Sequence, residues 1–138
     1  MTGDVSALRV LIPSYAGHDD APARRLSDQQ IRAWTGESLA DLQDRIAVAA
    51  VQDRFDALLM RCEFGDQLVI RALEADACGE PEAAATVEAH DAGVIAAAAR
   101  AKTVAQDGLD ALIGDLERAF DERAAAVIAL LKGQTNLR

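Results

Sequence analysis

The stretch Cys78-Gly79-Glu80-Pro81 is the clearest interruption in the sequence, and it decides the fold that we predict. Glycine readily closes one helix, and proline is well placed in the first turn of the next. The stretch therefore predicts a tight turn in a long antiparallel helical hairpin. The two arms cover about residues 37–77 and 82–132. At 1.5 Å per residue they would be roughly 60 and 75 Å long.

A regular apolar series supports the first arm. Its members recur at alternating steps of four and three, which keeps one helix face against a neighbouring helix. Because the series passes through Gly65, we expect this glycine to lie inside one continuous helix, as a point of close approach, despite a cost of about 1 kcal/mol relative to alanine. The members are Val51, Phe55, Leu58, Cys62, Gly65, Val69 and Ala72.

The second arm ends in the widest apolar stripe of the sequence, which a single neighbouring helix could not cover. We therefore expect two hairpins to pair as a homodimer and form a four-helix bundle. The alternative is a compact monomeric bundle of three or four helices, with breaks at Gly36, Gly65 and Gly108. The residues of the stripe are Leu109, Leu112, Ile113, Leu116, Phe120, Val127, Ile128 and Leu131.

The two ends of the chain are expected to lie outside the hairpin. Residues 1–26 are predicted to form an extended N-terminal arm. Ser27 followed by Gln30 is a capping-box pattern that starts a helical domain over residues 27–132, and residues 133–138 are expected to fray. The arm is interrupted by three residues that disfavour helix, which are Pro13, Gly17 and Pro22.

Composition agrees with an all-α protein. The sequence contains 30 alanines, whereas aromatic residues make up only 4% of it. Alanine is the best intrinsic helix former, and a scarcity of aromatic residues works against sheet. Alanine also buries little surface, so the composition predicts thin, closely packed helices.

Charge narrows the classes of partner. The net charge is −9, and residues 37–91 hold thirteen acidic residues against four arginines. Phosphate repulsion disfavours direct binding to nucleic acid, so the expected partner is another protein, one with a basic surface. Two cysteines form no disulfide framework, and neither a membrane-spanning run nor a leader is recognisable. We therefore expect a cytoplasmic protein that does not bind membranes.

The sequence offers little catalytic chemistry. Its only histidines are His18 and His90, which leaves His-rich metal sites and most acid–base arrangements without the residues they need. No glycine-rich phosphate loop occurs, so we expect no cofactor and no metal. The chemical alternative is a helical enzyme or a ligand- or metal-binding bundle. Its nearest candidate carboxylates are Asp53, Asp56, Glu63 and Asp66.

The leading hypothesis is a non-enzymatic protein–protein interaction module, such as an adaptor, an assembly factor or a small regulatory subunit. A third hypothesis is an acidic inhibitor that mimics nucleic acid. The candidate partner-binding residues lie in two groups, one on the N-terminal side and one at the hairpin tip. They are Leu11, Ile12, Tyr15 and Trp34, and Glu74, Asp76, Glu80 and Glu82.

Overall fold

The computed structural model of the chain describes residues 5–75, 78 and 80–136, and over this part it contains helices and no strand. In the described connections lie short 3-10 helices, among them η1 (Gln43–Arg45), η3 (Arg100–Lys102) and η4 (Gln106–Gly108). The α-helices are α1 (Val5–Leu11), α2 (Ala21–Ala40), α3 (Ala49–Phe64), α4 (Gln67–Leu73), α5 (Pro81–Ala99) and α6 (Leu109–Asn136).

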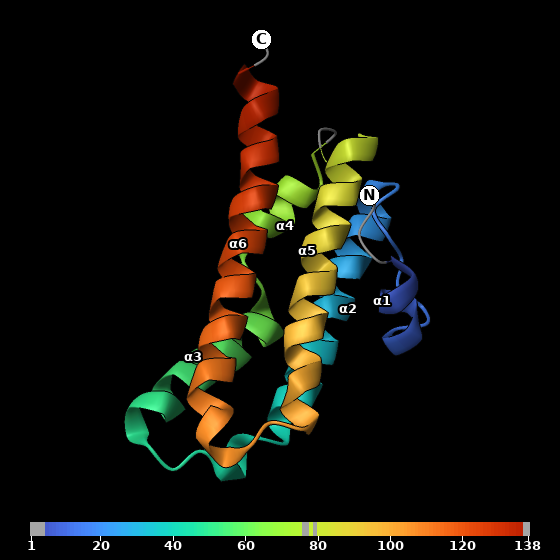
Figure 1. The fold of residues 1–138 in the computed structure, drawn as a ribbon. Coiled ribbons are helices and arrows are strands. Elements are labelled where there is room, and N and C mark those ends of the chain that lie inside the picture. The colour runs from blue at the N-terminus through green and yellow to red at the C-terminus, as the bar shows by residue number, and fades with distance from the viewer. Residues whose placement is uncertain (1–4, 76–77, 79, 137–138) are drawn as a thin grey trace.

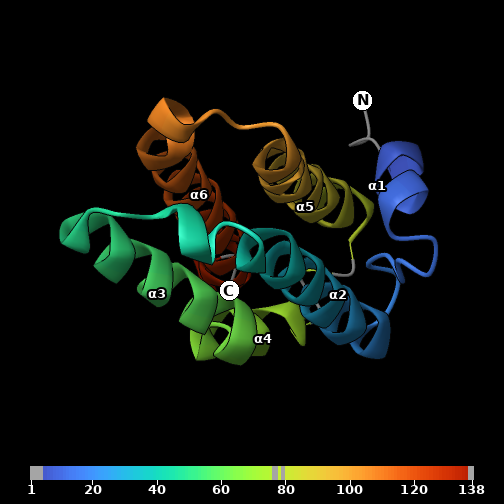
Figure 2. The same cartoon turned by 90° about the horizontal axis from the view of Figure 1, so that it is seen from below.

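The helices form a two-layered bundle. Helices α5 and α6 run antiparallel beside each other, and α2 and α3 make the second layer beneath them (Figures 1 and 2). Helix α1 lies outside the bundle, next to α5, and α4 packs on α6. The all-α prediction is confirmed. The hairpin of two long arms is not observed over the described residues, and the bundle is built from more helices than the three or four of the predicted compact alternative.

The continuous first arm of the hairpin was a wrong prediction. Helix α3 ends at Phe64, because Gly65 has φ +72°, a left-handed conformation that favours glycine. Asp66 then starts α4, its side-chain oxygen accepting hydrogen bonds from the amides of Leu68 (2.9 Å) and Val69 (3.4 Å). The regular apolar series is therefore divided between two helices that bury their faces in the same bundle.

The other glycines behave differently from one another. Gly36 does not break α2; a Cβ at this position would lie 3.4 Å from the Cβ of Cys62, so the glycine allows α2 and α3 to approach closely. The second arm is interrupted by residues 100–108, where η4 ends at Gly108 directly before α6. Of the three predicted breaks, those at Gly65 and Gly108 are confirmed and that at Gly36 is wrong.

The N-terminal segment is not extended throughout, because residues 5–11 form α1. Helix α2 begins at Ala21, six residues before the predicted start. Asp20 is its N-cap and accepts a hydrogen bond from the amide of Ala23 at 2.8 Å, while Pro22 occupies the first turn. Ser27, predicted as the cap, lies inside the helix.

Two further helix boundaries were predicted. Pro81 begins α5, as predicted. The predicted end at Gly133 is wrong, because α6 continues to Asn136. The turn itself falls largely outside the described residues, since residues 76, 77 and 79 are among those not described. Dimerisation, which a single chain does not test, stays a prediction.

Most residues of the predicted apolar faces lie in the core. One cluster joins residues of α1, α2, α3, α5 and α6, with Phe55, Leu112 and Leu116 fully buried. A smaller cluster lies where α4 meets α5 and α6, and contains Val69, Leu73 and Val127 among others. Several polar and charged side chains are also buried, among them His18, Asp91 and Arg123.

Candidate functional site

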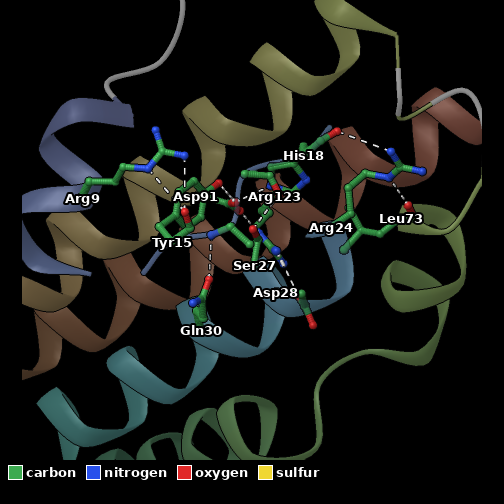
Figure 3. Close-up of polar contacts among 12 residues, drawn as sticks. Arg9, Tyr15, His18, Arg24, Ser27, Asp28, Gln30, Leu73, Asp91 and Arg123 are labelled. Carbon is green, nitrogen blue, oxygen red and sulfur yellow. Dashed lines mark hydrogen bonds and ion pairs between the residues drawn. The ribbon is translucent and has the colours of Figure 1, made fainter. Parts of the chain in front are cut away.

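A buried polar network centres on Asp91 of α5, whose side chain is fully buried (Figure 3). One carboxylate oxygen, Oδ2, accepts a hydrogen bond from the Tyr15 hydroxyl at 2.6 Å and lies 2.7 Å from Nε2 of His18. The other, Oδ1, accepts from Nε of Arg123 at 2.7 Å. Because an ionised carboxylate only accepts hydrogen bonds, the proton between His18 and Asp91 belongs to the histidine.

Arg123 carries the network from α5 across to α2. Its Nη2 lies 2.9 Å from Oδ1 of Asp28 and forms an ion pair with it. The second oxygen of Asp28 accepts from Nε of Arg32 at 2.9 Å, and Arg32 Nη1 donates to the backbone oxygen of Cys62 at 3.1 Å. Acids and bases thus alternate from α5 through α6 to α2, and the series of contacts ends at a backbone oxygen of α3.

The surroundings fix the charge of each member. Burial by itself raises the pKa of Asp91, but the Arg123 charge and the hydrogen bonds from His18 and Tyr15 outweigh it, so the pKa lies below its usual value. Burial and the Asp91 charge both raise the pKa of the Tyr15 hydroxyl. Burial by itself lowers the pKa of Arg123, but the neighbouring carboxylates of Asp91 and Asp28 raise it by more, so the pKa lies above its usual value. Asp91 is therefore ionised, Tyr15 neutral and Arg123 charged.

Further hydrogen bonds hold the segment between α1 and α2. Arg24 donates to the backbone oxygens of Leu73 and of His18, the latter at 3.4 Å, and so links the segment to the end of α4. The Ser27 hydroxyl donates to the backbone oxygen of Gly17 at 2.7 Å. Gly17, at φ +80°, supplies the left-handed bend that brings this oxygen within reach. Figure 3 shows these contacts beside the Asp91 network.

The network contains acid and base groups, but a substrate cannot touch them in this structure. Tyr15 and Arg123 are each 3% exposed, and His18 and Asp91 are fully buried. A small cavity of about 20 Å³ beside Asp28, Arg32 and Arg123 has room for one water molecule. The arrangement therefore fixes the N-terminal segment on the bundle and does not present a reaction centre.

The two thiols are also withdrawn. Cys62 and Cys78 are both free and buried. Burial raises the pKa of the Cys62 thiol to about 11, and it raises the pKa of Cys78 too. Since the thiolate is the nucleophile, neither group is activated for nucleophilic chemistry.

The exposed surface offers a different site, along the outward side of α3. We call this surface the α3 outer face, and all of its side chains are exposed. Its two large apolar residues stand out, Met60 at 58% and Phe64 at 61% exposure. Leu68, at the start of α4, is 64% exposed and follows them closely in the chain. The face consists of Asp53, Asp56, Met60, Glu63 and Phe64.

The arginines of α3 point away from this face, toward α6. Arg54 forms ion pairs with Asp110 (2.5 Å) and Glu117 (2.7 Å), and Arg61 pairs with Asp121 (2.8 Å). They therefore compensate acids of α6. Among the described residues, the three carboxylates of the α3 outer face have no ion-pair partner, so its negative charge is left uncompensated.

The four residues of the first predicted partner-binding group differ in their exposure to solvent. Leu11 is 40% exposed, but Ile12 and Tyr15 are buried at 7% and 3%. Trp34 is partly buried and packs against the main core. The N-terminal segment is thus packed on its own bundle, and these four side chains form no common exposed surface.

The second group stays on the outside. Glu74, Glu80 and Glu82 are exposed near the end where α4 and α5 meet, and Asp76 lies outside the described residues. Glu74 is within 3.8 Å of Arg25, a loose contact between two half-exposed side chains. Within four residues of these acids along the chain, none of the described large apolar side chains is exposed.

The carboxylates considered as metal ligands do not converge. Asp53, Asp56 and Glu63 lie on the solvent side of α3, and Asp66 caps α4. Across the described residues, no group of three or more His, Cys, Asp or Glu side chains is arranged to hold a metal ion.

Our sequence reasoning missed the buried network, although it left a signal. Asp91 stands four residues after Val87 and three before Val94, on the buried face of α5. Arg123 likewise stands between Phe120 and Val127 on the apolar stripe of α6. A charged residue at an apolar position of a helix face indicates a buried partner, because burying a lone charge is unfavourable.

Comparison with known proteins gave no match to a family model, to a curated protein or to a solved structure. Within the described residues, no helix is both long and apolar enough to cross a membrane.

Proposed function

We propose that this protein is a non-enzymatic protein–protein interaction module that binds its partner through the α3 outer face. The observation that carries the proposal is the exposure of Met60 and Phe64 on one side of one helix. Isolated apolar side chains on a surface need no explanation, but two that share a helix face with uncompensated acids form a surface of defined chemistry.

Energetics favour this face over the other candidates. Burying a methionine or phenylalanine side chain completely contributes about 1.5–3 kcal/mol, and such residues are enriched at interfaces. Glu74, Glu80 and Glu82 have no exposed large apolar residue within four described positions along the chain, and exposed ion pairs alone contribute little. The groups of the Asp91 network are inaccessible. An interaction surface therefore fits the exposed chemistry better than a catalytic site does.

The proposal also covers the setting of the interaction. We infer that the protein acts in the cytoplasm, where thiols stay reduced, and both of its cysteines are free. An adaptor, an assembly factor and a regulatory subunit all remain compatible with a single binding face, and the identity of the captured protein distinguishes them.

Affinity capture with matched variants tests the proposal. The full chain is immobilised and used to capture proteins from an extract of the cells that produce it, with quantification by mass spectrometry. Met60→Ser combined with Phe64→Ser should abolish capture. The control, Val10→Ser with Val48→Ser, removes two side chains that are 77% and 60% exposed elsewhere, and it should leave capture unchanged.

Circular dichroism confirms beforehand that both variants retain the wild-type helix content. Equal capture by the wild type and the Met60→Ser/Phe64→Ser variant would refute the α3 outer face as the binding surface. Loss of capture in the Val10→Ser/Val48→Ser control alone would move the interface to another part of the bundle.

A further inference from the structure

We infer that the partner of the α3 outer face presents a basic amphipathic helix, an inference that rests on the proposed function and names the chemistry it recognises. Three observations carry it: the spacing of the apolar side chains, the placement of the acids around them, and the removal of α3's own bases from the same surface.

The apolar spacing suits a helical ligand. Met60 and Phe64 are four residues apart and therefore lie one turn apart on the same side of α3. A partner helix with apolar residues at steps of three and four places one side chain against each of them. Since α3 has 16 residues and is about 24 Å long, a partner helix of similar length covers it.

The acids surround these two apolar side chains and favour a partner with positive charge. Asp53 and Asp56 lie on the turns before Met60, and Glu63 lies beside Phe64. None of the three has an ion-pair partner among the described residues, because Arg54 and Arg61 are occupied by acids of α6. A partner helix with Lys or Arg flanking its apolar stripe supplies the missing cations, and its charge also speeds the encounter.

A second copy of this chain suits the face poorly. A two-fold interface brings the same surface of each subunit against itself. The acidic face of one copy, with Asp53, Asp56 and Glu63, would then lie against the same acidic face of the other, with Arg54 and Arg61 still held on α6. Like charges across an interface are unfavourable, so the face favours a different protein over self-association.

A second group of three acids serves as a control for binding that depends only on the net charge of the protein. Glu74, Glu80 and Glu82 are three exposed acids away from Met60 and Phe64. Neutralising either group changes the net charge from −9 by +3, to −6. Any difference between the two triple variants therefore reports where the charge lies and not how much of it there is.

The probe is an 18-residue synthetic peptide of Leu, Ala and Lys, designed as an amphipathic helix and labelled for fluorescence anisotropy. It is titrated with the full chain and with two triple variants, Asp53→Asn/Asp56→Asn/Glu63→Gln and Glu74→Gln/Glu80→Gln/Glu82→Gln. Two control peptides carry Glu in place of Lys, or the same composition in an order without an apolar face. Backbone NMR shifts locate the bound peptide.

Of the three peptides, only the Lys peptide is expected to bind, and its binding should change the backbone NMR shifts of residues along α3. The α3 triple variant should bind at least about tenfold more weakly, since it loses three ion pairs at a partly dehydrated interface, and the other triple variant should bind as the wild type does. Raising the salt concentration should weaken binding to the wild type more than binding to the α3 variant.

Four results would overturn the inference. Equal weakening by both triple variants would show attraction by net charge, and equal binding of the scrambled peptide would show that the apolar residues contribute nothing. If the Lys peptide does not bind, whereas Met60→Ser/Phe64→Ser still abolishes capture, the partner's chemistry is wrong and the proposed function stands. If neither effect is seen, both fail.

Discussion

Replacement of Asp91 by alanine should destabilise the protein more than any surface substitution, because this carboxylate receives three buried donors. Tyr15, His18 and Arg123 all lose their acceptor at once. Breaking a buried ion pair by removing one partner costs about 3–5 kcal/mol, and domains of this size are stable by about 5–15 kcal/mol. Asp91→Ala should therefore remove a large fraction of the total stability.

Tyr15→Phe supplies a smaller, graded test of the same network. It removes one hydrogen bond to a charged acceptor and should cost about 1.5–3 kcal/mol. Because Tyr15 and Asp91 contact each other, the double variant should cost less than the sum of the single variants, by at least about 0.5 kcal/mol. Asp53→Ala, at an exposed position of α3, is the control and should stay within about 0.5 kcal/mol of the wild type.

Urea unfolding followed by circular dichroism and by the fluorescence of the single tryptophan, Trp34, measures these differences. With a urea dependence of about 2 kcal/mol per molar, a loss of 4 kcal/mol moves the midpoint by about 2 M. A cost below about 1 kcal/mol for Asp91→Ala would refute the network as the clamp of the N-terminal segment. Strict additivity between the stability costs of Asp91→Ala and Tyr15→Phe would refute it as well.

Three further predictions concern the backbone, a thiol and acid stability. Gly65→Ala should cost about 1–2 kcal/mol, because the residue has φ +72° and a Cβ would lie 2.9 Å from Cζ of Arg32, whereas Gly93→Ala, with open space around it, should stabilise by about 0.5–1 kcal/mol; equal midpoints in urea would contradict both. Modification of Cys62 by a thiol reagent at pH 8, read from that cysteine's peptide by mass spectrometry, should be at least about 100-fold slower in the native than in the urea-unfolded protein, since burial raises its pKa to about 11; similar rates would show that the thiol is accessible. The folded state lowers the pKa of Asp91, so the stability that this group contributes is present above its unfolded pKa of about 3.9 and is lost as the pH falls through the lower folded value; unfolding midpoints from pH 7 to pH 3 should therefore fall more steeply for the wild type than for Asp91→Ala, and parallel curves would contradict the assignment.

The sequence was sufficient to predict the helices and most of the buried positions, because both depend on residues that are close together in the chain. Alanine content and the spacing of residues such as Phe55, Leu112 and Leu116 act within one or two turns, and they determine helix formation and which face is apolar. The acidic excess of residues 37–91 is likewise a property of the sequence alone. Pattern could not separate the long hairpin from the compact bundle, because both bury the same stripes.

The break at Gly65 illustrates why. The apolar spacing continues from Cys62 to Val69, since α3 and α4 bury their faces in the same bundle, so the periodicity passes through a point where the backbone does not. The guanidinium of Arg32, a residue of α2, occupies the space next to Gly65, and this contact joins parts of the chain more than thirty residues apart. No local pattern contains that information.

The sites show the same division. Sequence by itself determined that the chain is helical, rich in alanine and acidic in its middle, because these features depend on neighbouring residues. Only the tertiary structure decided that Tyr15, Asp91 and Arg123 meet in one buried network, and that Arg54 pairs with Asp110 and leaves the outer acids of α3 uncompensated. Both depend on contacts between residues far apart in the chain, and the packing of the helices alone brings them together.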